Sequence, residues 1–279
     1  DMPDGRVKHI VQNITDPDIV PYIPDGIGNS TDRQRIPAVL IIPGGAFRRL
    51  VYNFEGEDVA KWLNSMGIAA FVLECRLPSD EHDNAEDVPL IDAMRAMRVI
   101  RGRAQEFGID EAKIGVMGFS AGGFMAALLS TAYESDVYAD YKYKDEYDKL
   151  SARPDFAVCS YPVISIDDCI EAGKRYMSEE QVLERISDSK AKILHKYNPD
   201  KLVRPDMPPV FICETDDDRT TLSENSVGFY MAARKAGVSA ELHIFRTGGH
   251  GYGCGDDFAQ TGEWKVLFTK WIKSIGIIS

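Results

Sequence analysis

Short aliphatic runs alternate with helical patterns along most of the chain, and this alternation restricts the fold more than any other feature. Apolar, β-branched runs of the length of buried strands occur at 38–45, 68–75, 155–165, 208–214 and 239–245. Helical patterns lie between or after them, at 55–67, 88–108, 222–236 and 259–274. Such alternation predicts an α/β fold, in which helices flank a mainly parallel central sheet.

Two regions fall outside the alternation. Residues 7–14 and 18–25 have the pattern of an opening pair of strands. Residues 166–206 are charged, helical in parts and poor in strand signals, which favours an insertion over the sheet. Because 279 residues suffice for one large α/β domain, we expect a single domain over 1–279, with 166–206 as a small helical cap over the active site.

Composition restricts the partners. Hydrophobic residues at 44% and charged residues at 27% are ordinary for a soluble globular protein, and no apolar run approaches the roughly 20 residues that span a bilayer. The net charge of -12 would repel a phosphate backbone, and Lys and Arg do not cluster. We expect no nucleic-acid or membrane partner. The oligomeric state stays open, as does the compartment, either the cytoplasm or a secreted location after removal of a signal peptide.

The five cysteines do not have the spacing of a metal site. Their number is odd, and neither CxxC spacing nor pairing with histidine suggests zinc. Cys75, Cys159 and Cys213 lie in strand-like runs, where buried free thiols are expected. The redox state of Cys169 and Cys254 stays open.

One serine stands among small residues in GVMGFSAGGFMAA (115–127). The run before Ser120 is strand-like and the run after it is helical, so the motif predicts a strand, a sharp turn and a helix. Gly118, Ala121 and Gly122 let the strand and the helix approach each other closely. Such a turn lifts the hydroxyl above the end of the strand, beside the N–H groups of the helix N-terminus. The motif predicts a nucleophilic serine; an ordinary small-residue turn is the alternative.

A nucleophilic serine needs a base and a carboxylate that orients the base, and both follow the last two predicted strands. TDDDRTT (215–221) contains three consecutive aspartates, and RTGGHGYG (246–253) contains His250 among glycines. His243 lies inside a predicted strand, where a packed or surface role is expected. The order serine, acid, histidine, each after a strand, predicts His250 as the base and one aspartate as the acid.

Backbone donors for an oxyanion are predicted in IIPGGAF (41–47), a glycine-rich turn directly after a buried strand. The N–H group of Gly44, Gly45 or Ala46 would form a pair of donors with that of Ala121. An ordinary strand-to-helix turn is the alternative, which the neighbouring serine motif disfavours.

Several blocks in the same order resemble the α/β-hydrolase superfamily, and most of all its small bacterial serine esterases, which include acetyl-xylan and other carbohydrate-ester hydrolases. The resemblance extends from about residue 36 to the C-terminus. It is carried by PGGAF (43–47), EGEDVAKWLNSMGIAAFVLECRLP (55–78), GIDEAKIGVMGFSAGGFMAA (108–127), RPDMPPVFICETDDDRTT (204–221) and GGHGYG (248–253).

The resemblance implies roles for individual residues. Ser120 matches the nucleophile and His250 the general base. The segment ENS (224–226) aligns so that Asp218 matches the acid, with Asp217 as the alternative.

Glu55 and Arg76 match recurring family positions. We expect them to form a structural ion pair, or hydrogen bonds that hold the oxyanion loop and the following strand; direct substrate contact is the alternative.

Two departures from the family pattern matter. Many relatives have His-Gly-Gly-Gly where this chain has Pro43 to Ala46, a change that keeps backbone donors and removes the histidine. The family acid is often followed by proline and apolar residues, whereas Asp218 is followed by Arg219, Thr220 and Thr221, which keeps Asp217 open as the acid.

The resemblance implies a carboxylic ester hydrolase that forms an acyl-enzyme and needs no metal or organic cofactor. The expected substrate is a short acyl ester, above all acetyl, of a carbohydrate such as xylan or xylo-oligosaccharides. Tyrosines in 133–150 would border the site, or else pack on the domain surface. The alternatives are a feruloyl esterase, an aryl formamidase or a serine peptidase with the same triad, and a catalytically inactive binding protein.

Overall fold

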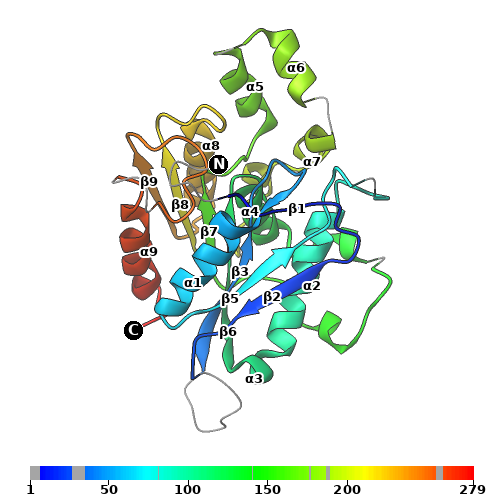
Figure 1. Ribbon diagram of the computed structural model, residues 1–279, viewed down its shortest axis with the longest axis vertical. Helices are drawn as coiled ribbons and strands as arrows, with labels where there is room; N and C mark the ends of the chain where they lie inside the picture. The colour runs from blue at the N-terminus through cyan, green and yellow to red at the C-terminus, as the bar shows by residue number, and fades with distance from the viewer. Residues whose placement is uncertain are drawn as a thin grey trace.

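A seven-stranded sheet forms the centre of the computed structural model (Figure 1), which describes residues 7–26, 35–80, 82–139, 141–175, 177–186, 189–255 and 260–279. The strands lie in the order β2 (Asp18–Tyr22), β5 (Ala69–Glu74), β3 (Ile36–Ile42), β6 (Ile109–Phe119), β7 (Ala157–Ser160), β8 (Val210–Thr215) and β9 (Ala240–Phe245). Only the β2–β5 pair among these is antiparallel. The predicted α/β class with a mainly parallel sheet is confirmed.

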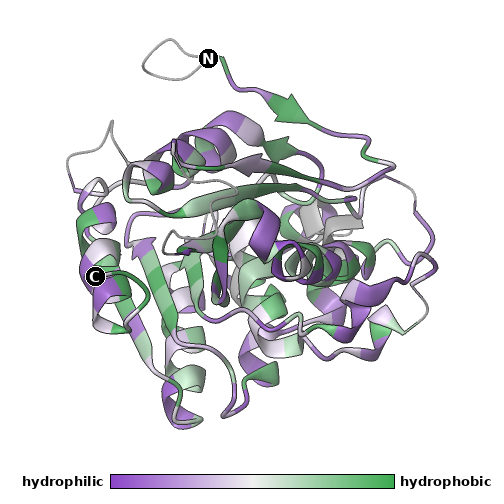
Figure 2. Cartoon of the chain, turned by 90° about the horizontal axis from the view of Figure 1, so that it is seen from below, coloured by the Kyte–Doolittle hydropathy of each residue, from purple (hydrophilic) through white to green (hydrophobic). Residues whose placement is uncertain are grey.

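Both faces of the sheet are covered, which explains why the central strands are apolar at successive positions. In β3, Leu40 and Ile42 face one core while Val39 and Ile41 face the other. The first core packs against α2 (Val88–Gly102), α4 (Ala121–Ala132) and α8 (Ser223–Lys235). The second packs against α1 (Asp58–Ser65) and α9 (Glu263–Ser274). Figure 2 shows hydrophilic and hydrophobic residues alternating along the covering helices.

The N-terminal strands differ from the prediction. β1 is only Ile10–Val11 and pairs with β4 (Leu50–Val51), apart from the main sheet. β2 instead joins the edge of the main sheet beside β5, so the two opening strands do not pair with each other. A hydrogen bond next to this pair of strands also holds β1 in place: the Tyr52 N–H donates to the His9 carbonyl at 2.9 Å.

Two helices also differ from their predicted form. The segment expected as one helix over 88–108 divides into α2 and the short α3 (Ala104–Phe107). Gly102 ends α2 where the Tyr147 ring packs so closely that a Cβ would overlap it. The predicted helix at 55–67 begins with a π-helical turn, Asn53–Glu57, continues as α1 and is followed by Gly67 at φ 74°.

The insertion at 166–206 is mainly helical where it is described. It contains α5 (Ile166–Lys174), α6 (Glu179–Ile186), α7 (Ser189–Lys196) and a 3₁₀ turn at Pro199–Leu202. Figure 1 shows α5 and α6 projecting from the body of the molecule, with α7 nearer to it. Tyr197 fastens the end of α7 by donating to Asp87 Oδ1 at 2.5 Å. The role of the insertion as a cap stays a prediction, as does the single domain over 1–279.

Among the described helices, none is both long enough and apolar enough to cross a bilayer.

The contact between β6, β3 and α4 depends on glycines. A Cβ on Gly118 would lie 1.9 Å from the Gly122 carbonyl oxygen, and one on Gly122 would lie 1.9 Å from the Ile42 carbonyl oxygen. We expect Gly122→Ala to lower the free energy of unfolding by about 1–3 kcal/mol, because the overlap forces backbone shifts. Urea unfolding measures the change.

Gly228→Ala in α8 is the matched control, because its Cβ would meet nothing within 4 Å. It should raise the free energy of unfolding by about 0.5–1 kcal/mol through helix propensity. Equal changes in the free energy of unfolding would contradict the conclusion that the close contact of α4 with β3 requires glycine at 122.

Candidate active site

Ser120 occupies a strained turn between β6 and α4. Its backbone has φ 54° and ψ −117°, a region that residues with a Cβ rarely adopt. The Ser120 N–H donates to the Ser160 carbonyl at 3.0 Å, and the Phe124 N–H donates to the Ser120 carbonyl at 3.0 Å. These bonds fix the turn from the neighbouring strand and from the first turn of α4.

Three side chains from separate loops form a chain of hydrogen bonds. His250 Nε2 lies 2.8 Å from Ser120 Oγ, and His250 Nδ1 lies 2.6 Å from Asp218 Oδ2. Ser120 follows β6, Asp218 follows β8 and His250 follows β9, so the carboxyl ends of parallel strands bring them together. The three predicted residues are in hydrogen-bond contact in the order required for nucleophile, base and acid.

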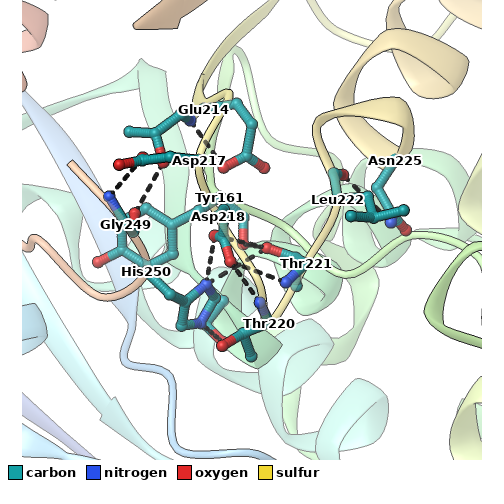
Figure 3. Close-up of polar contacts among 12 residues, drawn as sticks. Tyr161, Glu214, Asp217, Asp218, Thr220, Thr221, Leu222, Asn225, Gly249 and His250 are labelled. Carbon is teal, nitrogen blue, oxygen red and sulfur yellow. Dashed lines mark hydrogen bonds and ion pairs between the residues drawn. The ribbon is translucent and has the colours of Figure 1, made fainter. Parts of the chain in front are cut away.

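Asp218 is fixed by its own loop (Figure 3). Its Oδ1 accepts from the N–H groups of Thr220 at 2.7 Å and Thr221 at 2.9 Å, and its Oδ2 accepts from the Thr221 hydroxyl at 3.0 Å. The residue is 2% exposed. Burial alone would raise its pKa, but the bonds from His250 and the two N–H groups outweigh burial and lower it. Asp218 therefore stays ionised beside the imidazole.

Asp217 has a different contact. Its Oδ1 accepts from the Gly249 N–H at 2.8 Å, one residue before His250 (Figure 3). It holds the backbone of the histidine loop, whereas Asp218 contacts the ring. The threonines that depart from the family pattern are the residues that hold Asp218.

The predicted oxyanion loop passes directly beside the nucleophile. A Cβ on Gly44 would lie 2.9 Å from Ser120 Cβ, and the backbone then turns through positive φ values at Gly45, Ala46 and Phe47. The Gly44 N–H donates to Glu55 Oε2 at 2.7 Å. The prediction of Gly44 as an oxyanion donor is therefore corrected: its N–H is already bonded to a buried carboxylate and is not the donor. Gly45 or Ala46 remains the predicted donor of this loop. Ala121 remains the second predicted donor, since it begins α4 and the first N–H groups of a helix have no partner within it.

Glu55 and Arg76 do not pair with each other. Glu55 bonds to the oxyanion loop, as one of the two expectations had it. Arg76 pairs with Asp92 of α2, with Nη2 2.6 Å from Oδ1, and so fastens the end of β5 to that helix.

The tyrosines of 133–150 pack on the domain, except Tyr143, which is 77% exposed. The Arg98 guanidinium of α2 lies 4.0 Å from the Tyr138 ring centre, and Tyr141 stacks on Tyr138 at 5.1 Å. The Tyr147 ring packs against Gly102 at the end of α2. These contacts match the alternative of packing, rather than a sugar-binding surface. His243 likewise pairs with Glu241 at 2.7 Å and packs near Phe211.

Two residues near the site carry no clear signal in the sequence. Glu214, the fully buried residue before the last one of β8, accepts from the Ser226 hydroxyl at 3.2 Å, and burial together with the charge of Asp218 raises its pKa. Tyr161 follows β7 and contacts Glu55. Both lie inside runs that read only as strands, which is why the pattern did not distinguish them.

A mainly parallel sheet with a serine on the turn after one strand, and with aspartate and histidine on loops after two later strands, defines the α/β-hydrolase fold. The BD-FAE family model matches residues 27–232, and the chain belongs to this family.

Named relatives agree with this assignment. The chain is 31% identical over 240 residues to an acetylxylan esterase of Xylanibacter ruminicola, covering 85% of the chain and 45% of the relative. It is 31% identical over 227 residues to endo-1,4-beta-xylanase B of Butyrivibrio fibrisolvens, covering 81% of the chain and 34% of the relative. The chain thus spans half or less of the length of these curated relatives.

A solved structure is similar over almost the full chain. It is an acetyl ester-xyloside bifunctional hydrolase from Caldicellulosiruptor lactoaceticus, with a TM-score of 0.76, 35% identity and 98% of each chain covered.

Substitution of the two aspartates is expected to change the rate of Ser120 labelling to different extents. Asp218→Asn should slow the labelling of Ser120 by a fluorophosphonate about a thousandfold or more, because an amide favours the wrong imidazole tautomer. Asp217→Asn should label within a fewfold of the unmodified protein, since an amide oxygen still accepts from the Gly249 N–H. Rates of covalent labelling, followed by mass spectrometry, decide between them. The reverse order of effects would assign the acid to Asp217.

Proposed function

We propose that this protein is a serine carboxylesterase that removes short acyl groups, above all acetyl, from a carbohydrate such as xylan or xylo-oligosaccharides. The observation that carries the proposal is the contact of Ser120 Oγ with His250 Nε2, and of His250 Nδ1 with Asp218, beside a strained glycine-rich loop. This arrangement supports acyl transfer to serine.

The proposed mechanism has two halves. His250 Nε2 takes the proton of Ser120 while Oγ attacks the ester carbonyl, and the N–H groups of Ala121 and Gly45 or Ala46 stabilise the oxyanion. His250 then gives this proton to the sugar oxygen as the bond between that oxygen and the carbonyl carbon breaks, so the sugar departs as an alcohol and an acyl-enzyme remains. Water, deprotonated by His250, releases the acid and restores Ser120. Asp218 keeps the imidazole in the required tautomer and stabilises its charged form.

The names of the relatives support a xylan-derived substrate. The acetylxylan esterase and the bifunctional hydrolase are both named for acetyl esters, and xylan or xyloside occurs in all three names.

A small apolar cavity supports a short acyl group. It has a volume of about 10 Å³, borders Gly45 and Ala121, and is lined further by Phe47, Leu50, Cys75, Leu77, Pro89 and Met125. A space of this size holds about one water-sized group, such as the methyl of an acetyl. Longer acyl chains would require the lining side chains to move.

Acetate release tests the proposed function. Acetylated xylo-oligosaccharides and 4-nitrophenyl acetate are assayed side by side, with Ser120→Ala as the control. We expect release from both substrates and its loss in Ser120→Ala, because that substitution removes the attacking oxygen. Turnover of 4-nitrophenyl acetate alone would keep the serine esterase and reject the sugar ester, which directs the search to feruloyl, formyl and peptide substrates. A folded protein that neither turns over nor labels with a fluorophosphonate would be a binding protein.

The cavity gives a separate prediction about chain length. Met125→Ala should raise the ratio of kcat/KM for 4-nitrophenyl butyrate to that for the acetate by about tenfold, the effect of one or two methylenes in an apolar pocket. Met231→Ala is the matched control, because Met231 lies on the exposed face of α8 and is 58% exposed. This substitution should leave the ratio unchanged. An unchanged ratio in Met125→Ala would remove the cavity from the acyl site.

A further inference from the structure

Two buried side chains connect the oxyanion loop to the histidine loop. Glu55 Oε2 accepts from the Gly44 N–H at 2.7 Å, and its Oε1 accepts from the Tyr161 hydroxyl at 2.9 Å. The Tyr161 oxygen in turn accepts from the Gly253 N–H at 3.0 Å. An unbroken chain of hydrogen bonds therefore runs from Gly44, beside Ser120, to Gly253, three residues after His250.

Tyr161 also contacts the histidine and the acid loop. Its ring meets the His250 ring edge to face, with centres 5.0 Å apart. Its carbonyl oxygen lies 3.4 Å from the hydroxyl of Thr221, the residue that also donates to Asp218. The fully buried Tyr161 therefore contacts the histidine loop and the acid loop directly and reaches the oxyanion loop through Glu55.

The backbone of Tyr161 is strained. Its φ is 38°, which is unusual for a residue with a bulky side chain. The Tyr161 N–H donates to the Cys213 carbonyl at 2.7 Å, and this bond holds the conformation. Strain of this kind persists only where the surroundings over-determine it, and it concentrates at functional sites.

The hydrogen bonds define the state of Glu55. Both of its oxygens accept, from an N–H and from a hydroxyl, so the ionised form satisfies every contact. The residue is 5% exposed, and burial raises its pKa, while the Tyr161 hydroxyl, the charge of His250 and the Gly44 N–H act in the opposite direction. Burying a carboxylate is costly unless it is hydrogen-bonded. Here its bonds go to groups that flank the reacting atoms.

We propose that Glu55 and Tyr161 are positioning residues that set the separation between the oxyanion donors and His250. The inference rests on the proposed function. By bonding the Gly44 N–H, Glu55 fixes the loop that presents Gly45 and Ala46, and Tyr161 transmits the same constraint to the histidine loop. Neither side chain needs to touch the substrate. Because a misplacement of about 1 Å can cost about a hundredfold in rate, the pair acts mainly on kcat.

Two substitutions, alone and combined, test the pair with 4-nitrophenyl acetate. Tyr161→Phe removes the hydroxyl and keeps the ring, and Glu55→Gln keeps the shape and removes the charge. Each should lower kcat by about 10- to 100-fold with KM within about threefold. The double variant should be no slower than the slower single variant, because either change breaks the same chain of hydrogen bonds.

Hydrogen exchange gives a readout that does not depend on turnover. In Tyr161→Phe, peptides covering 43–51 and 248–255 should both exchange faster, although the substitution lies in neither segment. Tyr133→Phe is the matched control, because the Tyr133 hydroxyl also donates to a carboxylate, Asp206 Oδ2, at 2.7 Å. Tyr133 follows the far end of α4, about 20 Å along the helix from Ser120. It should leave kcat and both peptides unchanged.

The outcomes separate this inference from the proposed function. Tyr161→Phe with wild-type kcat and unchanged exchange overturns the inference while the esterase stands, and so do single-variant losses that multiply in the double variant. If the unmodified protein hydrolyses no ester, the proposed function fails, and exchange in the two peptides still decides whether the pair joins the loops.

Discussion

The close approach of β6 to α4 is the constraint on which the rest of the site depends. Gly118 and Gly122 let the strand and the helix meet backbone to backbone, and the turn between them leaves Ser120 at positive φ. Only this conformation presents the hydroxyl above the sheet while α4 directs its first N–H groups toward the same point. The acid and the base can then arrive on ordinary loops, because β8 and β9 run parallel to β6 and end at the same edge.

Three consecutive aspartates show how local contacts divide the tasks of similar groups. Asp218 turns inward, where two N–H groups and a hydroxyl of its own loop hold the carboxylate beside His250. Asp217 turns outward and holds the loop backbone before His250. One carboxylate therefore bonds to the imidazole itself, and its neighbour holds the backbone just before the histidine.

The sequence predicts those parts of the molecule that follow from periodicity and from the ends of strands. Continuous apolar runs identify β3, β5 and β8, because both faces of these strands are covered. The positions of Ser120, Asp218 and His250 follow because each lies on a turn or loop that comes after a predicted strand. The pairing of β1 with β4 was not predictable, since two residues carry no period. Nor was the contact of Tyr161 with Glu55, which are 106 residues apart and meet only through the packed sheet.

The correction at Gly44 has the same physical origin. From the sequence, three successive N–H groups in a glycine-rich turn are equivalent donors, because nothing in a backbone pattern distinguishes them. A buried carboxylate 11 residues later removes that equivalence by accepting from the first of them. Gly45 or Ala46, whose positive φ values turn the backbone there, stays the predicted donor of this loop. A residue outside the three hydrogen-bonded side chains thus holds the backbone of the loop beside the nucleophile, and the long-range contacts of Glu55 are as much a part of the site's geometry as the motif that contains Ser120.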